Sequence, residues 1–399
     1  MTTAVAIRHK GKVIARLGRS DRSAFGLWFW EIDRVLLLFV TILISIGLVA
    51  VAAGSPASAQ RYSGGDVVFS PLYYFWRQFV WVMLGIPVMI AVSMMPQQIA
   101  RRFSLGMAAF FSVMLAIVPI LGSGANGAQR WINFGFAGFQ PSEFLKPFFV
   151  VTLAWLLSLR SHDQELPVIP ISGALTGVIA ILLMMQPDFG QTIIFGAIWM
   201  VMMMLIGLSA RVMGALASAG ALAVAAAYLF YPTATQRINN FLFATGDTYQ
   251  TDNAHATITA GGFFGTGPGG GEMKFRLPEA HTDYIFSVIG EEFGLIACIA
   301  IVGLFLAMTV RVFVKLLDEE DTFLVLAAAG LITQFTVQAM INIAVNIGIA
   351  PSKGMTLPFI SYGGSSMIAL CMGFGLLLAF TRKNPYLTRS PYVVKWSGK

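Results

Sequence analysis

Charged residues are scarce in this chain of 399 residues: they make up 11%, whereas hydrophobic residues make up 57%. Soluble globular domains carry charge on about a quarter of their residues, so this composition excludes an ordinary soluble protein. Cysteine is almost absent. Cys298 and Cys371 both fall inside apolar segments, where a thiol behaves as a small hydrophobic group, so no disulfide framework is expected.

Signatures of nucleotide and nucleic-acid binding are also missing. The sequence contains no GxxxxGK[ST] phosphate-binding loop, and a GxGxxG match at Gly265–Gly270 lacks the βαβ unit of a dinucleotide fingerprint. The net charge of +7 comes from basic residues scattered between apolar segments instead of gathered in one patch. Scattered charges of this kind are typical of membrane anchoring. No nucleic-acid partner is therefore predicted.

What the chain has in abundance is long apolar runs. A helix needs about 17 to 25 mostly apolar residues to cross a bilayer, and these runs do not alternate as the strands of a membrane barrel do. The sequence therefore predicts an all-α, polytopic integral membrane helical bundle with about ten transmembrane helices. The expected spans are 35–53, 78–95, 103–121, 144–159, 167–187, 189–208, 212–231, 284–310, 322–346 and 365–381.

The distribution of Lys and Arg predicts how the chain is oriented. With a cytoplasmic N-terminus, 18 of the 26 basic residues fall on the inner side, as the positive-inside rule requires. Both termini are thus expected in the cytoplasm, as a basic N-terminal segment (1–34) and a tail (382–399). The membrane domain between them (35–381) then directs its unusual loops outward, above all the large loop 232–283. Any chemistry is expected on that outer side.

Two basic residues near the outer ends of spans are candidates to hold an anionic group. Arg130 belongs to the motif RWIN, and Lys146 lies one turn inside an apolar span. An ammonium at that depth must reach outward or find a partner in the bundle. The preceding segment Pro141–Glu143 has the features of a helix start, so a capping role is the alternative for this motif.

Short polar and glycine-rich segments supply further outer candidates. Gln186–Gly190 is expected to form a tight turn with Asp188 as an exposed cap. Gly261–Gly271 contains seven glycines in eleven residues and is expected to be a flexible loop whose backbone could approach a phosphate. Lys274 and Arg276 follow it and could add positive charge. A plain flexible loop without a ligand is the alternative.

The segment Leu277–Gly294, LPEAHTDYIFSVIGEEFG, brings acids to the head of an apolar helix. Ionisable residues are costly in such a setting and point to function. Asp283 is either a helix cap, worth about 1 kcal/mol, or a functional carboxylate with His281 close by in the sequence.

One later span carries four amide side chains spaced four residues apart, and therefore on one helix face. They either bond neighbouring helices or form the wall of a polar cavity. The loop that follows adds another cation and several hydroxyl groups. The cavity candidates are Gln334, Gln338, Asn342, Asn346, Ser361 and Ser365, with Lys353 as a further anion-binding candidate.

Taken together, these motifs resemble the SEDS family (shape, elongation, division and sporulation). The resemblance covers roughly residues 33–385 and rests on RWINFG with QPSEFLK, QPDFG, LPEAHTDYIFSVIGEE and PFISYGGSS, in this order. The long basic N-terminus and the LPEAHTD loop favour the division-associated members over the elongation-associated ones. The chain departs from the family's usual pattern in the glycine loop, at Tyr284 and at Ala254-His255.

The resemblance implies a peptidoglycan glycosyltransferase that polymerises lipid II on the outer face of the bacterial cytoplasmic (inner) membrane at the division septum. Asp283 would be the catalytic base, accepting a proton from the acceptor hydroxyl as the anomeric carbon is inverted. No organic cofactor is expected, and a divalent cation (Mg²⁺ or Mn²⁺) with Asp283 as ligand is the alternative to a base. The candidates to bind the departing pyrophosphate are Arg130, Lys146, Lys274, Arg276, Lys353 and His281.

Other functions stay open beside this one. Ten spans with a polar stripe also suit a lipid II flippase, although the ionisable groups cluster outside and no paired interrupted helices appear. An elongation polymerase and a scaffold that only recruits division proteins are further alternatives. The partners implied by the resemblance are lipid II, membrane lipid, a cognate class B penicillin-binding transpeptidase and other division proteins.

Overall fold

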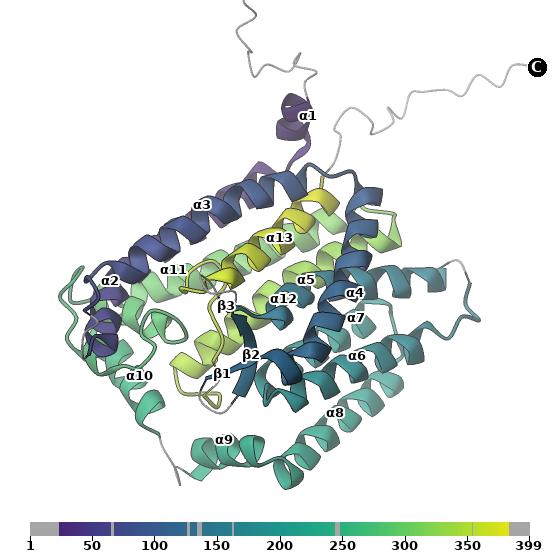
Figure 1. Cartoon of the computed structure of the whole chain (residues 1–399). Coiled ribbons are helices and arrows are strands. Elements are labelled where there is room, and N and C mark those ends of the chain that lie inside the picture. The colour runs from purple at the N-terminus through teal and green to yellow at the C-terminus, as the bar shows by residue number, and fades with distance from the viewer. Residues whose placement is uncertain are drawn as a thin grey trace, which may run out of the picture.

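The computed structural model describes residues 24–64, 68–125, 128–133, 138–161, 163–243, 248–352 and 354–382. It is a helical bundle in which all ten predicted spans appear as helices (Figure 1). Eight of them are long and apolar enough to cross a membrane, and α7 and α13 are shorter apolar helices. The prediction of a polytopic helical membrane protein is confirmed. The ten helices are α2 (Arg34–Tyr62), α3 (Tyr73–Ser93), α4 (Gln97–Leu121), α5 (Pro141–Ser158), α6 (Val168–Met185), α7 (Phe189–Leu205), α8 (Ala210–Phe230), α11 (Ile285–Leu316), α12 (Thr322–Asn346) and α13 (Ser365–Phe380).

Helices α5, α12 and α13 form the centre of the bundle. The apolar windows of α5 and α12 are 78% and 72% buried, whereas that of α8 is 0% buried. Small residues permit the close packing, because a Cβ atom at Gly330 of α12 would lie 2.7 Å from side-chain atoms of Val150 and Met202. α12 therefore contacts α5 and α7 directly, and polar residues on these helices meet inside the bundle.

The glycine-rich segment, expected to be a free loop, is packed against α11. It follows α10 (Tyr249–Ala260) and meets α11 where Gly294 interrupts the helix with a φ of 79°. A Cβ atom at Gly294 would lie 2.4 Å from the carbonyl oxygen of Phe263, so only glycine fits there. The amide of Leu295 donates to the carbonyl of Gly262 at 2.9 Å. The glycine-rich segment thus packs between the end of α10 and the part of α11 around Gly294.

Short elements between the spans build one end of the bundle, opposite α1 (Ala24–Glu31) (Figure 1). A three-stranded antiparallel sheet pairs Ile132 with Phe139 across its second and third strands. The sequence does not predict this sheet, because strands of two to six residues leave no alternating pattern. The short elements of this end are β1 (Ser123–Ala125), β2 (Ala128–Asn133), β3 (Gly138–Phe139), α9 (Pro232–Phe243) and η2 (Met273–Arg276), and they belong to the loops predicted to face outward. A further short element, η1 (Leu159–Ser161), lies between α5 and α6.

The two described ends of the chain lie together at the opposite end of the bundle. Arg382, which follows α13, lies 3.5 Å from the carboxylate of Glu31 in α1. Its terminal nitrogens donate to carbonyl oxygens at the end of α3. The ends therefore share one side, as expected for ten spans, and the assignment of that side to the cytoplasm stays a prediction. Residues 1–23 and 383–399 lie outside the described residues.

Candidate active site

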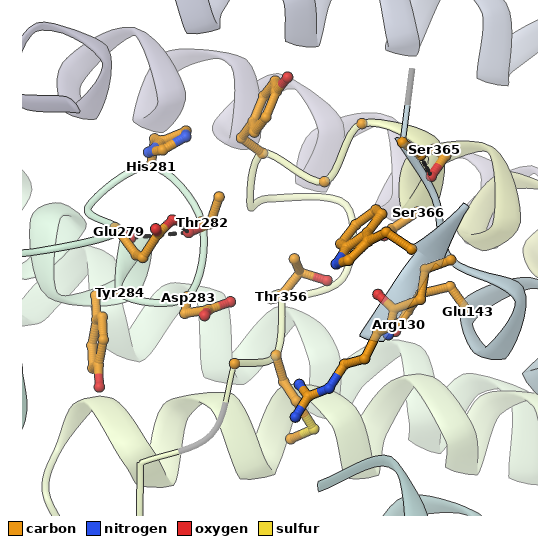
Figure 2. Close-up of a pocket in the computed structure, with 18 of the residues that line it drawn as sticks. Arg130, Glu143, Glu279, His281, Thr282, Asp283, Tyr284, Thr356, Ser365 and Ser366 are labelled. Carbon is orange, nitrogen blue, oxygen red and sulfur yellow. Dashed lines mark hydrogen bonds between the residues drawn. The ribbon is translucent and has the colours of Figure 1, made fainter. Parts of the chain in front are cut away.

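A polar cavity of about 830 Å³ lies at the end of the bundle that carries the sheet and α9. Its walls come from α2, α3, β2, the start of α5, α9, the loop before α11 and the loop before α13. Figure 2 shows side chains from several of these elements facing a common space. The charged residues of the lining are Arg77, Arg130, Glu143, Arg237, Glu279 and Asp283.

Asp283 is positioned through its backbone. Its carbonyl oxygen accepts hydrogen bonds from the side-chain amides of Asn342 (2.8 Å) and Asn346 (3.0 Å) on α12. The carbonyl of the preceding residue, Thr282, accepts a hydrogen bond from the hydroxyl of Ser361 at 2.6 Å. Because these donors are buried, the loop is held from the interior of the bundle. The carboxyl group is left to face the cavity (Figure 2).

The carboxyl group of Asp283 has no hydrogen-bond partner among the residues that the structure describes. Helix α11 begins after Tyr284 without a side-chain cap, so the helix-cap alternative for Asp283 is wrong. Burial, followed by the negative charges of Glu279 and Glu143, raises the pKa of Asp283 to about 7. A carboxyl group with this pKa exchanges its proton near neutral pH, as a general base must.

Glu279 shapes the loop on which Asp283 lies. It takes a positive φ of 54°, and its carboxylate accepts hydrogen bonds from the hydroxyls of Tyr62 (2.5 Å) and Thr282 (2.8 Å). A strained backbone at a cavity wall is typical of functional sites. Both oxygens of Glu279 are thus occupied, unlike those of Asp283.

His281 contributes an aromatic ring to the cavity instead of a charge. Its ring centroid lies 4.0 Å from that of Tyr74 and 5.2 Å from that of Tyr362. Burial lowers the pKa of His281 to about 4, so the imidazole is neutral at physiological pH. It supplies no positive charge to a pyrophosphate, and this predicted role loses its physical basis.

Arg130 lines the cavity, but part of its guanidinium bonds the turn between α6 and α7. Its Nη2 donates to the carbonyl of Pro187, and its Nε lies 3.7 Å from a carboxylate oxygen of Asp188. Asp188 caps α7 as predicted, by accepting from the amide of Gln191. It is buried and not exposed, because it is the counter-ion of Arg130. The ion pair fixes the position of the guanidinium at the cavity wall.

Lys146 lies beneath the cavity and outside its lining. Its ammonium donates to Glu143 and to Gln338, both at 2.9 Å, and its side chain is 1% exposed. Glu143 lines the cavity and also accepts from Gln191 at 2.5 Å. Lys146 is therefore the buried counter-ion of a cavity carboxylate, and it has no direct access to a substrate.

The polar stripe of α12 bonds the surrounding loops. Besides holding Asp283, Asn342 donates to the carbonyl of Met355 at 2.6 Å, and Gln338 donates to that of Thr356 at 3.0 Å. None of the four amides lines the cavity within the described part of the chain. Of the two alternatives for the stripe, the geometry supports bonding between segments.

The two serines predicted for the cavity differ in position. Ser365, at the start of α13, lines the cavity and donates to the carbonyl of Gly138 in β3 at 2.9 Å. Ser361 lies behind the lining, where its hydroxyl also accepts from the amide of Leu357 at 2.8 Å. Only Ser365 is placed to meet a ligand.

The remaining predicted cations are not brought to the cavity. Lys274 is buried and forms an ion pair with Glu292 of α11. Arg276 is exposed and does not belong to the lining. Lys353 lies outside the described residues, although the residues on either side of it line the cavity.

Sequence reasoning missed two cavity arginines. Arg77 of α3 donates to the hydroxyl of Tyr73 at 3.1 Å, and Arg237 lies on α9. From the sequence, Arg77 and Arg237 serve only to predict the orientation of the chain, as basic residues on the outer side. The signal that could have found Arg237 is the amphipathic pattern of α9, where Gln236, Arg237 and Asn240 all line the cavity.

An apolar groove of about 490 Å³ lies on α3 beside the cavity. Its residues Trp76, Val80 and Leu84 are 58%, 55% and 52% exposed, as expected for side chains that contact lipid. Arg77 and Trp81 line both the groove and the cavity. The polar cavity thus adjoins a surface that a membrane would cover.

A metal centre built from protein ligands alone is not found: the described residues contain no group of three His, Cys, Asp or Glu side chains that could hold an ion. Mg²⁺ often needs only one or two carboxylates, with its other ligands from water and substrate phosphates. Asp283 and Glu143, which both line the cavity, fit that smaller role.

The fold and the cavity define a class of protein: a polytopic membrane protein with a carboxyl group and arginines around a polar cavity that adjoins the lipid. The family model described as "Cell cycle protein", which covers FtsW, RodA and SpoVE, matches residues 33–386. The chain belongs to this family, and it is a multi-pass inner-membrane protein. The predicted family membership is confirmed.

Relatives of known name support the same grouping. The chain is 39% identical over 382 residues to the probable peptidoglycan glycosyltransferase FtsW of Caulobacter vibrioides, covering 92% of this chain and 93% of the relative. It is 32% identical over 366 residues to the protein of the same name from Coxiella burnetii, covering 88% and 96%.

Two solved structures share the fold. One comes from work on the structural coordination of polymerization and crosslinking by a peptidoglycan synthase complex, with a TM-score of 0.71, 25% identity and coverage of 88% of this chain and 97% of the other. The second is the rod shape determining protein RodA of Thermus thermophilus, with a TM-score of 0.65, 25% identity and coverage of 88% and 96%.

Proposed function

We propose that this chain is a peptidoglycan glycosyltransferase that polymerises lipid II at the outer face of the inner membrane during septal cell-wall synthesis. The observation that carries the proposal is the carboxyl group of Asp283. It faces a polar cavity, lacks a partner in the described part of the chain, and has a pKa of about 7. Relatives that cover most of the chain are named for this activity.

In the proposed reaction, Asp283 accepts the proton of the acceptor sugar's hydroxyl group as that oxygen attacks the anomeric carbon of the donor. The bond between the anomeric carbon and the phosphate oxygen breaks with inversion, and the lipid pyrophosphate leaves with the bonding electrons. Near pH 7 a substantial fraction of Asp283 is ionised and able to accept the proton. The donor carries its own leaving group, so no nucleotide is required.

The cavity cations support the departure of the pyrophosphate. Asp188 holds the guanidinium of Arg130 in place before the reaction, so its charge needs no reorganisation as negative charge develops. Lys146 acts indirectly, by neutralising Glu143 beneath the cavity. A divalent cation, when bound, would add positive charge at the pyrophosphate, with Asp283 or Glu143 as its protein ligand.

The apolar groove on α3 supports sideways entry of the substrate from the bilayer. The groove and the cavity meet at Arg77 and Trp81. A lipid-linked sugar could place its headgroup in the cavity while its hydrocarbon chain stays on the apolar side. The arginine at the junction would then face the boundary between the two parts.

Assignment of the cavity to the outer face rests on the distribution of basic residues. Single cysteines introduced at Ser63 and Thr248 should react with an impermeant thiol reagent in intact cells, and one at Gln98 should not. Labelling of Gln98 with protection of the other two positions would reverse the orientation.

A transpeptidase of the class B penicillin-binding type is the partner that we propose, together with other division proteins. The similarity to a chain from a peptidoglycan synthase complex supports assembly with a crosslinking enzyme. The identities of 39% to FtsW of C. vibrioides and 25% to RodA of T. thermophilus favour a division role over an elongation role.

Transport of lipid II across the membrane is the second candidate function. The observation in its favour is the buried polar network of Glu143, Lys146 and Gln338, which continues beneath the cavity into the bundle. In this network the ammonium is bonded on both sides and 1% exposed. It closes the cavity floor, which favours chemistry at one face over a path through the membrane.

A polymerisation assay in detergent separates the two functions, because a flippase needs two compartments and a polymerase does not. Purified protein, with its transpeptidase partner, should convert lipid II into glycan chains. Asp283→Asn should abolish the product, since an amide cannot accept the proton. Asp252→Asn is the matched control, because this acid is exposed on α10 outside the cavity lining. Wild-type rates for Asp283→Asn, or lipid II transport by a wild type that forms no glycan, would reject the proposal.

A further inference from the structure

Arg237 is the cavity cation for which the structure provides no bonding partner. Within the described residues its guanidinium makes no hydrogen bond or ion pair, whereas Arg130 bonds Asp188 and Arg77 bonds Tyr73. The residue is half-buried on α9 and lines the cavity. A partly buried guanidinium without a partner is costly, and its place in the lining leaves it available to an anionic ligand.

Charges of both signs act on Arg237. Burial, together with the positive charge of Arg130, lowers the pKa of Arg237, and the charge of Asp188 acts in the opposite direction. Arg237 therefore has a second guanidinium in its surroundings, and the nearby carboxylate of Asp188 is already paired with Arg130.

The face of α9 that meets the cavity carries further hydrogen-bond donors. Gln236 and Asn240 lie beside Arg237 in this helix and also line the cavity. Both carry side-chain amides, which can donate to anionic oxygens without adding charge. The helix therefore presents a polar face to the cavity that includes this cation.

We propose that Arg237 and Arg130 together form the anion site that binds the pyrophosphate of the lipid-linked donor. Each planar guanidinium can donate two parallel hydrogen bonds to phosphate oxygens, and a diphosphate has enough oxygens for both. This inference rests on the proposed function. It adds a residue on α9 that lies outside every motif used to predict the site.

The location of this anion site couples it to the base. The charges of both arginines lower the pKa of Asp283, against the effect of burial, so the three groups share one part of the cavity. A bound diphosphate would neutralise the arginines and thereby raise the pKa of Asp283. The carboxylate therefore becomes a stronger base when the donor is present.

Binding of inorganic pyrophosphate to the full-length protein in detergent tests the proposal without turnover. By titration calorimetry, Arg237→Gln should bind about 10- to 100-fold more weakly than the wild type, as expected for the loss of a charge-assisted contact. Arg237→Lys should retain part of the affinity. Arg276→Gln is the matched control: it removes the same charge from an exposed position outside the lining and should not change binding. Thermal unfolding without ligand checks that each variant is folded.

Several outcomes would overturn the inference. They are unchanged binding by folded Arg237→Gln, an equal loss in Arg276→Gln, and no binding by the wild type at millimolar pyrophosphate. Displacement of pyrophosphate by an equal concentration of phosphatidylglycerol in mixed micelles would identify a phospholipid headgroup site instead. Polymerisation measured in parallel separates the two claims. If pyrophosphate binding depends on Arg237 but no glycan forms, the anion site is supported and the proposed function is rejected. If glycan forms but pyrophosphate binding does not depend on Arg237, only the anion site is rejected.

Discussion

The cavity has one wall that is bonded to the interior of the bundle and another that lies at the edge of the bundle. The first wall consists of the loop of Asp283 and the start of α5. Buried amides of Asn342 and Asn346 on α12 hold the backbone of this loop. The second is α9, which packs against α8, a helix with a 0% buried apolar window. Figure 1 shows α8 and α9 along the outside of the bundle. The interior thus fixes the proposed base, while a peripheral helix carries one of the cavity cations.

The comparison also shows where unpaired charge is tolerated. On the bonded wall, the ionisable side chains Glu143, Lys146 and Glu279 all have partners. Asp283 and Arg237 have none among the described residues, and each comes from a different wall. Uncompensated charges cost stability, and under the proposed function the substrate would complete the environment of both groups in this cavity.

The largest expected effect comes from breaking the buried pair beneath the first wall. Lys146→Met leaves the carboxylate of Glu143 buried without its counter-ion, so unfolding free energy should fall by about 3 to 5 kcal/mol. Thermal unfolding in detergent measures the loss. The double variant with Glu143→Gln should recover most of it, because no charge is then left unpaired. If Lys146→Met is fully stable but does not polymerise lipid II, the ammonium acts on the substrate after all.

A smaller effect should follow from loosening the backbone of Asp283. Asn342→Leu removes one of the two side-chain donors to the carbonyl of Asp283 and the side-chain donor to that of Met355. Polymerisation should fall by about 10- to 100-fold, since the weakened support of Asp283 adds to the cost of about 1 to 3 kcal/mol for a buried acceptor left unsatisfied at Met355. Gln334→Leu is the matched control on the same stripe, because its buried Oε1 has no partner in the described structure. Equal losses in both variants would show that the stripe serves only packing.

The smallest effect is expected at His281. His281→Phe keeps an aromatic ring beside Tyr74 and Tyr362, so activity should stay within about threefold of the wild type if the imidazole serves only in ring packing. A glycan polymerisation assay under substrate saturation measures this. A loss as deep as that of Asp283→Asn would mean that the imidazole takes part in the chemistry.

These residues also show what could be predicted from the sequence. The ten spans were predictable because the length and apolar composition of each run suffice for a membrane-spanning helix, whatever the rest of the chain does. An acid at the head of an apolar helix made Asp283 a candidate, and the structure places it in the cavity lining; its role as the base was implied by the family resemblance and stays a prediction. The capping role of Asp188 followed from local turn chemistry, but its burial did not, since its partner Arg130 lies 58 residues earlier.

Contacts between distant segments were beyond the sequence. The partner of Lys146 on α12 is 192 residues away in the sequence. The sequence therefore predicted that Lys146 lies within an apolar span, but not that its ammonium donates hydrogen bonds to Glu143 and Gln338. The glycine-rich segment was open to two conformations, because glycine suits a free loop and a close backbone contact equally well. Packing against Gly294 decided between them.

The most direct test of the central claim, that Asp283 is the base, is the dependence of kcat/KM for lipid II on pH between about 5.5 and 8.5. The raised pKa means that Asp283 is protonated and inactive below about 7, so the rate should rise with pH and level off above that value. Arg237→Gln should move the inflection upward, because the arginine lowers this pKa, and Arg276→Gln should leave it in place. A pH profile without an inflection, or an inflection at the same pH in the wild type and in Arg237→Gln, would contradict the assignment of Asp283 as the base.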